Sequence, residues 1–299
     1  MSITSTGYVG RFAPSPSGDL HFGSLVTAVA SFADALHENG QWILRIDDID
    51  TPRVAPGSAD RIVHSLAGLG FEWAGAIRWQ SKRMAAYEEA SQALLNRQLA
   101  YPCRCSRRDI ELISEPGREG PIYPGTCRLW NGLGEGQRAI RLRTDSALIS
   151  FTDRVYGSQH QNIGHEVGDF VIRRADNLTA YQLAVVVDDA LDRITHVVRG
   201  ADLLLSTPRQ IYLSELLDYE SPMYLHVPLA KDANGKKISK SDNASALNAR
   251  EPLSALQSAW RFLGQPALAK DLSSPAEFWV EAREKWSVPA LATHTQNAV

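Results

Sequence analysis

Two segments of the chain carry residues that could handle a nucleotide. In the first, residues 11–24, a turn punctuated by proline and glycine delivers His21 and Gly23 to the start of an expected helix. Free backbone N–H groups and the dipole at a helix start favour an anionic phosphate, glycine permits close approach, and histidine can donate to phosphate oxygens. A histidine near a helix start is by itself more often structural, so this segment needs support from elsewhere in the chain.

The second segment is the loop Lys237-Ile238-Ser239-Lys240-Ser241, which follows an expected strand at 223–229. The chain has only seven lysines, and four of them lie at positions 231–240. Two ammonium groups could neutralise a departing polyphosphate, a form of catalysis that is almost wholly electrostatic. Taken alone, the loop would be better interpreted as a solvated lysine-rich turn.

Three cysteines, Cys103, Cys105 and Cys127, lie close together in the sequence. Their odd number, and an N-terminus without the basic and apolar regions of a signal peptide, argue against a disulfide scaffold and favour a cytoplasmic protein. Three thiols in such a chain suggest zinc, which would need a fourth ligand. The alternative is that these are buried cysteines without a metal.

Composition restricts the function further. The net charge is −3, from 31 basic and 34 acidic residues, whereas a general polyanion binder is usually basic, so any RNA contact must come from a local patch. The longest purely apolar run, residues 183–187, is too short to span a bilayer, and we expect no membrane association. No long exposed apolar stripe demands a partner, so a monomer is expected.

The elements that must position these residues alternate between strands and helices. A strand at 8–12, a helix at 20–36 and a strand at 42–46 form a βαβ unit, which predicts a parallel sheet with helices on its faces. Further predicted elements are helices from 58 to 70 and after 81, an apolar segment at 179–191, a strand at 194–198, a helix with Thr207 as N-cap and Pro208 at its first position, and C-terminal helices at 252–262 and after Ser274. Residues 103–160 are loop-rich, with short alternating stretches at 139–143 and 149–155, which favours an inserted α+β unit.

Together, the first two segments resemble the HIGH and KMSKS motifs of class I aminoacyl-tRNA synthetases in order, separation and strand–loop context. The strings RFAPSPSGDLH at 11–21, RIDDID at 45–50 and VVRGAD at 197–202 resemble the glutamyl branch of that family. The chain departs from these motifs at Ser24, where HIGH ends in histidine, and at Ser241, where glutamyl enzymes often carry arginine.

The resemblance implies roles for individual residues. Charge on the phosphates would be stabilised by His21, Lys237 and Lys240, and ATP, accompanied by Mg²⁺, would be bound by His21, Gly23, Ser24 and Lys240. L-Glutamate has two carboxylates and one ammonium group, which require cationic forks and an anion. The residues expected to contact it are Arg11, Ser15, Asp47, Tyr181 and Arg199.

Within that set, Asp47 would bind the α-amino group, and the arginine that takes the side-chain carboxylate is left open. A metal-ligand role for Asp47 competes, but its acidic cluster lacks nearby histidine or cysteine partners. Without the motifs, Tyr181 would be better interpreted as a core aromatic residue and Arg199 as a surface ion pair.

The resemblance also extends to the cysteines and to the domain organisation. Bacterial relatives carry C-x-C and Y-x-x-x-C in this insert, which makes Tyr123 the favoured fourth ligand of one structural Zn²⁺, beside Cys103, Cys105 and Cys127. The expected units are residues 1–102, the first half of a Rossmann-like catalytic domain; 103–178, an inserted zinc-binding subdomain like those that bind the tRNA acceptor end; 179–242, the second half with the lysine loop; and 243–299, a C-terminal helical region.

Too few residues follow Ser241 to form the anticodon-binding domain of a glutamyl-tRNA synthetase. The chain therefore resembles the short paralogues, the glutamyl-queuosine tRNA(Asp) synthetases, which implies transfer of activated glutamate to queuosine in the anticodon loop of tRNA(Asp). The alternatives are a truncated glutamyl-tRNA synthetase that charges tRNA(Glu), a non-catalytic paralogue that binds tRNA or glutamate, and a nucleotidyltransferase of the same superfamily.

Overall fold

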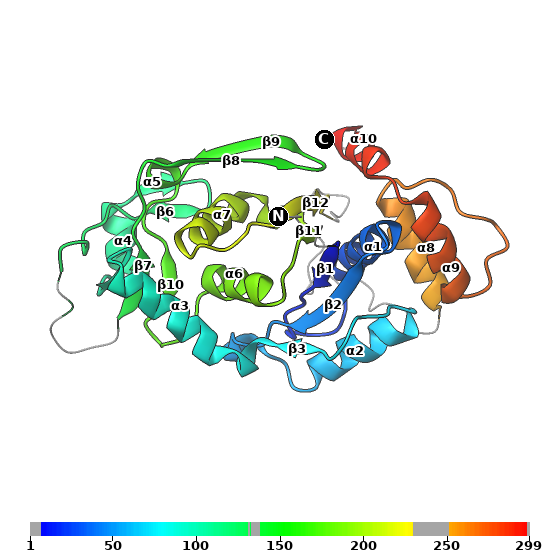
Figure 1. The fold of residues 1–299 in the computed structure, drawn as a ribbon, viewed down its shortest axis with the longest axis horizontal. Coiled ribbons are helices and arrows are strands. Elements are labelled where there is room, and N and C mark those ends of the chain that lie inside the picture. Colours follow the sequence, from blue (N-terminus) through cyan, green and yellow to red (C-terminus); the bar gives the residue numbers. More distant parts are fainter. Residues whose placement is uncertain (1–6, 131, 133–137, 230–250, 298–299) are drawn as a thin grey trace, which may run out of the picture.

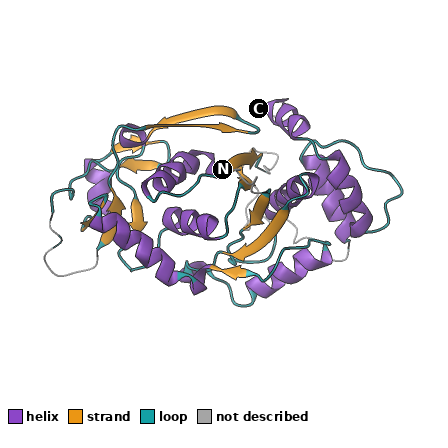
Figure 2. Cartoon of the chain, viewed as in Figure 1, coloured by secondary structure: helices purple, strands orange, loops and turns teal. Residues whose placement is uncertain are grey.

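The computed structural model describes residues 7–130, 132, 138–229 and 251–297. A seven-stranded sheet lies between layers of helices (Figure 1; Figure 2). Its strand order is β3 (Arg78–Trp79), β2 (Gln41–Ile46), β1 (Val9–Phe12), β11 (His196–Gly200), β12 (Met223–Val227), β8 (Leu148–Asp153) and β9 (Gly157–Asn162). All neighbouring strands are parallel except β8 and β9, which form an antiparallel hairpin at one edge. The predicted α/β class is therefore confirmed.

The predicted βαβ unit opens the fold as β1, the helix α1 (Phe22–His37) and β2. Leu25, Val29 and Phe32 of α1 are buried, as their helical spacing predicts. After α1 the chain passes so close to β1 that a β-carbon at Gly40 would lie 2.6 Å from atoms of Tyr8, which explains the glycine at this turn.

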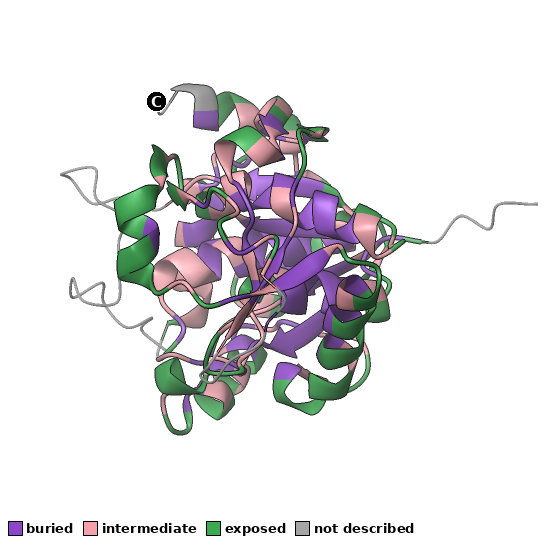
Figure 3. Cartoon of the chain, turned by 90° about the vertical axis from the view of Figure 1, so that its left-hand side faces the viewer, coloured by how far each residue is buried: buried purple, intermediate pink, exposed green. Residues whose placement is uncertain are grey.

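Successive residues of the central strands point into two different cores. Leu44 and Val198 pack with α1, whereas their neighbours Ile43 and Val197 pack on the opposite face, so both faces of the sheet are buried. The first face is covered by α1, α2 (Ser58–Gly68), α8 (Pro252–Phe262), α9 (Pro275–Lys285) and α10 (Val288–Asn297). The second face is covered by α3 (Met84–Asn96), α6 (Tyr181–Leu191) and α7 (Thr207–Leu216). Figure 3 shows the resulting buried interior between more exposed helices.

The region expected to be an insert forms a smaller layer with its own sheets. One is a three-stranded antiparallel sheet of β10 (Val171–Arg173), β7 (Ala139–Leu142) and β4 (Ala100–Cys103), and the other is the hairpin of β5 (Glu115–Gly117) and β6 (Gly120–Ile122). Two short helices accompany them, α4 (Arg107–Ile113) and α5 (Ile163–Glu166). The stretch at 149–155 belongs instead to the large sheet, because Asp153 of β8 pairs with Tyr224 of β12. The division at residues 102, 178 and 242 stays a prediction.

The C-terminal helices α8 and α9 lie where the sequence predicts them, and α10 is an addition that it does not predict. Phe32 of α1 contacts Trp279 of α9 with ring centroids 4.7 Å apart, and the indole Nε1 of Trp286 donates to Asp34 at 2.8 Å. These contacts fix the C-terminal helices to the helix that begins at His21.

The predicted N-cap role of Thr207 is wrong. The described part of the chain contains three short 3₁₀ helices: η1 (Thr51–Arg53), η2 (Gln80–Lys82) and η3 (Ala201–Ser206). Because η3 runs directly into α7, Ser206 is the cap residue, and the hydroxyl of Thr207 donates back to the carbonyl of Leu203 at 3.2 Å.

Among the described residues, no helix has the length and apolar character needed to cross a membrane.

Candidate active site

A cavity of about 350 Å³ opens at the carboxyl ends of β1, β2, β11 and β12. From β1 the chain continues toward one edge of the sheet and from β11 toward the other, and ligands of open α/β sheets bind at such a switch point. The wall of the cavity includes all the described residues that are predicted to bind glutamate or ATP, namely Arg11, Ser15, His21, Gly23, Ser24, Asp47, Tyr181 and Arg199.

The N-terminus of α1 forms one end of the cavity. His21 is the N-cap: its Nδ1 accepts the backbone N–H of Ser24 at 3.3 Å, and its Nε2 lies 2.9 Å from Ser24 Oγ. An accepting Nδ1 places the imidazole proton on Nε2, so Nε2 donates to the serine hydroxyl. Ser24, the residue that departs from the HIGH motif, therefore orients His21 within the wall of the cavity.

The turn between β1 and α1 carries Ser15, which is exposed at the mouth of the cavity. The carbonyl of Pro14 accepts the backbone N–H of Asp47 at 3.0 Å, so the turn is fixed to the end of β2. Tyr181, the first residue of α6, is 40% exposed on the same wall, which rules out the core-aromatic interpretation.

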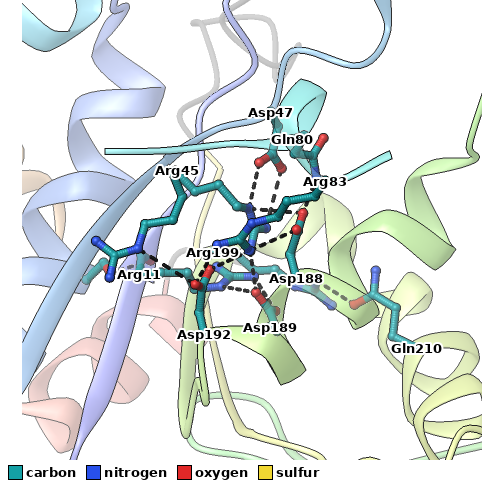
Figure 4. A network of polar contacts seen from close by, with 12 residues as sticks. Arg11, Arg45, Asp47, Gln80, Arg83, Asp188, Asp189, Asp192, Arg199 and Gln210 are labelled. Atoms are coloured by element: carbon teal, nitrogen blue, oxygen red, sulfur yellow. Dashed lines mark hydrogen bonds and ion pairs between the residues drawn. The ribbon is translucent and has the colours of Figure 1, made fainter. Parts of the chain in front are cut away.

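Behind the cavity lies an arginine–aspartate cluster, made of Arg11, Arg45, Arg83, Asp47, Asp188, Asp189 and Asp192 (Figure 4). Arg11 donates to both oxygens of Asp189, at 3.3 and 3.2 Å. Arg45, which has no exposed surface, donates to Asp47 and to Asp189, each at 2.7 Å. The two guanidinium groups are therefore held side by side on one carboxylate.

Asp188 anchors the rest of this cluster. It accepts from Gln80 Nε2 at 2.7 Å, from Tyr87 OH at 2.9 Å and from Arg83 at 3.0 Å, and it lies 3.5 Å from Arg45. Buried charges are tolerated only when they are paired and hydrogen-bonded in this way. The cluster thus holds Arg11 and Asp47 at the cavity, and it does so from the face of the sheet that α6 covers.

Burial and charge act in opposite directions on the carboxylates of the cluster. Burial raises the pKa of Asp47 to about 6, although the charge of Arg45 partly offsets this effect. For Asp189, burial also raises the pKa, but the charges of Arg11 and Arg45 outweigh it and the pKa falls below its usual range. Asp189 is therefore ionised at neutral pH, whereas Asp47 changes charge near pH 6.

Arg199 lies at the end of β11 and is only 4% exposed, which rules out a surface ion pair. Its nitrogens donate to His226 Nε2 at 3.0 Å, Gln210 Oε1 at 2.7 Å and Thr207 Oγ1 at 2.8 Å. Arg199 and Arg11 thus supply buried cationic groups to one cavity, and Asp47 supplies an anion. Lys237 and Lys240 lie outside the described residues.

The predicted metal ligands come together away from this cavity. The sulfur atoms of Cys103, Cys105 and Cys127 all lie within 4.8 Å of one another. The hydroxyl of Tyr123 is 3.4 Å from the sulfurs of both Cys103 and Cys105. Arg141 donates to the sulfur of Cys103 at 3.3 Å, and its guanidinium lies 4.0 Å from the centre of the Tyr123 ring.

The sequence does not identify the residues that hold Arg11 and Arg199 in place. Asp188 and Asp189 end a buried apolar run in α6, and two adjacent acidic residues in that position are a signal that could have revealed them. Arg45 lies inside the string RIDDID at 45–50, but the family resemblance implies no role for it. His226 and Asp153, which support Arg199, give no comparable signal.

Comparison with known proteins agrees with this geometry. The family model described as tRNA synthetases class I (E and Q), catalytic domain, matches residues 8–252. A glutamate tRNA ligase from Elizabethkingia meningosepticum, solved in complex with its amino acid, has a TM-score of 0.76 and 26% identity over 94% of this chain and 65% of that chain. The glutamate-tRNA synthetase of Elizabethkingia anophelis gives a TM-score of 0.78 at 25% identity, covering 94% of this chain and 66% of that one. This chain thus spans about two thirds of the solved chains.

Relatives of matching length are closer in sequence. The glutamyl-Q tRNA(Asp) synthetase of Pseudomonas putida is 49% identical over 294 residues, which are 98% of this chain and 97% of that protein. The protein of the same name from Neisseria meningitidis is 45% identical, covering 97% of this chain and 99% of the relative. The chain therefore belongs to the glutamyl and glutaminyl family of class I tRNA synthetases, within the group of glutamyl-Q tRNA(Asp) synthetases.

Proposed function

We propose that this chain, a ligase of the aminoacyl-tRNA synthetase type, activates L-glutamate with ATP and transfers it to queuosine in the anticodon loop of tRNA(Asp). The observation that carries the proposal is one cavity in which Arg11 and Arg199 supply cations, Asp47 an anion and His21 a helix N-terminus. Those groups complement the two carboxylates and the ammonium of glutamate and the phosphates of ATP. The names and full-length similarity of the relatives support the same reaction.

In the first step, an oxygen of the glutamate α-carboxylate attacks the α-phosphorus of ATP, and the bond from that phosphorus to the bridging oxygen breaks. Pyrophosphate leaves with Mg²⁺, and glutamyl-adenylate remains. The N-terminus of α1, with its cap residue His21, stabilises charge on the phosphate oxygens, and Lys237 and Lys240 neutralise the leaving group. In the second step, a queuosine hydroxyl attacks the acyl carbon and AMP leaves with the hydroxyl proton.

Exchange of labelled pyrophosphate into ATP, measured with a panel of amino acids and no tRNA, tests the activation step. Glutamate alone should support exchange, because glutamine lacks the second carboxylate and aspartate is one methylene shorter than glutamate. A requirement for tRNA(Glu) would instead favour the truncated glutamyl-tRNA synthetase, and no exchange with any amino acid would favour the non-catalytic paralogue.

The pKa of Asp47 predicts a pH dependence for glutamate binding. Because burial raises that pKa to about 6, the carboxylate is ionised above pH 6 and protonated below it. The kcat/KM for glutamate should therefore fall by about tenfold per pH unit below about pH 6, since this ratio reports the free enzyme. The kcat/KM for glutamate in Asp47→Asn should be low and should not show this step. A wild-type profile that is flat from pH 8 to pH 5 would contradict the role of Asp47.

We further propose that Cys103, Cys105, Cys127 and Tyr123 hold one structural Zn²⁺. Three sulfur atoms and one phenolic oxygen within mutual reach suit tetrahedral zinc, and the nearby guanidinium of Arg141 offsets the negative charge of the ligands. When bound, the ion would cross-link the insert.

The monomeric state stays a prediction.

Removing this metal should loosen the insert. Metal analysis is expected to find one zinc per chain in the wild type and a large loss in Cys127→Ser. Limited proteolysis should then cut within residues 103–142 faster in Cys127→Ser and in chelator-treated wild type, because the ligands come from two separate segments, 103–105 and 123–127. Re-addition of zinc should restore protection to the wild type only. Equal cleavage rates with and without metal would contradict a structural ion.

A further inference from the structure

A buried chain of hydrogen bonds runs from β8, which lies next to the edge strand of the large sheet, to the cavity. Asp153 of β8 contacts Nδ1 of His226 at 2.7 Å, and Nε2 of His226, on β12, accepts from Nε of Arg199, on β11, at 3.0 Å. His226 has no exposed surface, and Asp153 is 1% exposed. Three neighbouring parallel strands therefore contribute one residue each to a single line that ends at a cavity-lining arginine.

The chemistry of Arg199 determines the tautomer of His226. An arginine Nε–H can only donate, so Nε2 of His226 must be the acceptor and Nδ1 must carry the proton. That proton is donated to Asp153, whose other oxygen accepts the backbone N–H groups of Val155 and Tyr156 at 3.0 and 2.9 Å. Burial lowers the pKa of His226, and the neighbouring guanidinium lowers it further, against the opposing effect of Asp153, so the ring stays neutral.

The remaining contacts of Arg199 leave its guanidinium in one place. Gln210 and Thr207 of α7 accept from its two terminal nitrogens, and the Tyr224 ring lies 5.3 Å from the guanidinium carbon. The contact of Nε with His226 adds a further point of attachment, on the stem side of the guanidinium, and so helps to fix the orientation of its plane relative to β11. A planar fork binds a carboxylate well only when that plane is correctly oriented.

We propose that His226 is a positioning residue for glutamate binding: its Nε2 lone pair holds the guanidinium of Arg199 in the plane that meets a glutamate carboxylate, and Asp153 fixes the tautomer that makes this possible. The inference rests on the proposed function, because it requires Arg199 to contact glutamate. His226 itself does not reach the substrate.

Two substitutions at position 226 separate the two ring nitrogens. Asparagine in His226→Asn can still donate to Asp153 but has no atom at the Nε2 position, whereas the amide oxygen in His226→Gln reaches that position and can accept from Arg199. The KM for glutamate in the exchange assay should rise by about 10- to 100-fold in His226→Asn, the range for a lost hydrogen bond to a charged group. It should stay within about threefold of wild type in His226→Gln.

Asp153→Asn provides an independent test from the other end of the line. The backbone N–H groups of Val155 and Tyr156 would bind the amide oxygen of the new asparagine, so its NH₂ group would donate to Nδ1 of His226. The histidine proton would then move to Nε2, where it would face the N–H of Arg199 and break that hydrogen bond. The same selective rise in the KM for glutamate is expected. If His226→Asn does not fold, as judged by circular dichroism and thermal melting, this variant carries the test.

The KM for ATP separates a positioning role from a merely structural one, because a structural defect would change the KM for ATP as well as that for glutamate. We expect it to stay within about twofold of wild type in all three variants, since the His21 end of the cavity is unaffected. An unchanged KM for glutamate in His226→Asn and Asp153→Asn, or equal increases for glutamate and ATP, would overturn the positioning role while leaving the proposed function intact. A wild type with no glutamate-dependent exchange would overturn both.

Discussion

Replacing Lys240 with alanine should lower the kcat of glutamate-dependent ATP–pyrophosphate exchange by about 10²- to 10³-fold, the usual cost of removing one preorganised donor to developing charge. In the sequence, the lysine follows β12, the strand whose carboxyl end borders the cavity at Pro228 and Leu229. Pyrophosphate gains negative charge as it departs, and none of the described residues that line the cavity is a lysine. The KM for glutamate should change little, because the ammonium acts on the phosphates.

The matched control for this variant is Lys270→Ala, since Lys270 is an exposed lysine between α8 and α9. Its exchange rate should equal that of wild type. Both variants should melt at the wild-type temperature, so any difference between them reports catalysis rather than folding. Exchange at the wild-type rate in Lys240→Ala would be incompatible with the assignment of this loop to phosphate handling.

Arg45→Met should destabilise the protein by about 3–5 kcal/mol, the range for removing one partner from a buried ion pair. Arg45 has no exposed surface, and it donates to Asp47 and Asp189 and lies 3.5 Å from Asp188. Without it, three buried carboxylates lose their shared cation. Chemical denaturation measures the loss, and glutamate activation should fall with it, because Asp189 also orients Arg11.

The same variant should show a characteristic dependence on pH. Because the charge of Arg45 lowers the pKa of Asp47 and of Asp189, its loss raises both pKa values in the folded state, so the folded variant binds protons more readily. The variant's stability deficit should therefore be smaller at pH 5 than at pH 8. The control is Arg61→Met, whose ion pair with Asp19 is exposed on both sides and should contribute below about 1 kcal/mol. Equal free energies of unfolding for the two variants would contradict the role of Arg45.

The residues proposed to contact the ligands could be predicted because they lie in local strings with a physical reason for each position. His21, Gly23 and Ser24 must occupy a helix N-terminus, and Arg11 and Arg199 must end strands of a parallel sheet. Those requirements are local, so they can be read from alternation, helical spacing and turn residues. The same holds for Cys103, Cys105 and Cys127, although only the fold brings Cys127 against the other two.

The residues that hold Arg199 in place could not be found in this way, because only the pairing of distant strands brings them together. Asp153 lies in a stretch that reads as part of a loop-rich insert, and its role depends on β8 joining the large sheet beside β12. His226 reads as one polar residue in an apolar strand, and nothing local indicates that it faces Arg199. Non-local register is the information that a single sequence lacks.

Transfer of labelled glutamate to tRNA is the measurement that tests the central claim most directly. Purified tRNA from queuosine-containing and queuosine-deficient cells would be compared, each with and without periodate, which destroys vicinal diols of queuosine and of the 3′ ribose. We expect acceptance only by queuosine-containing tRNA(Asp), and its loss after periodate pretreatment. Equal acceptance by tRNA(Glu) from queuosine-deficient cells would contradict the account, because the acceptor would then be an ordinary 3′ terminus.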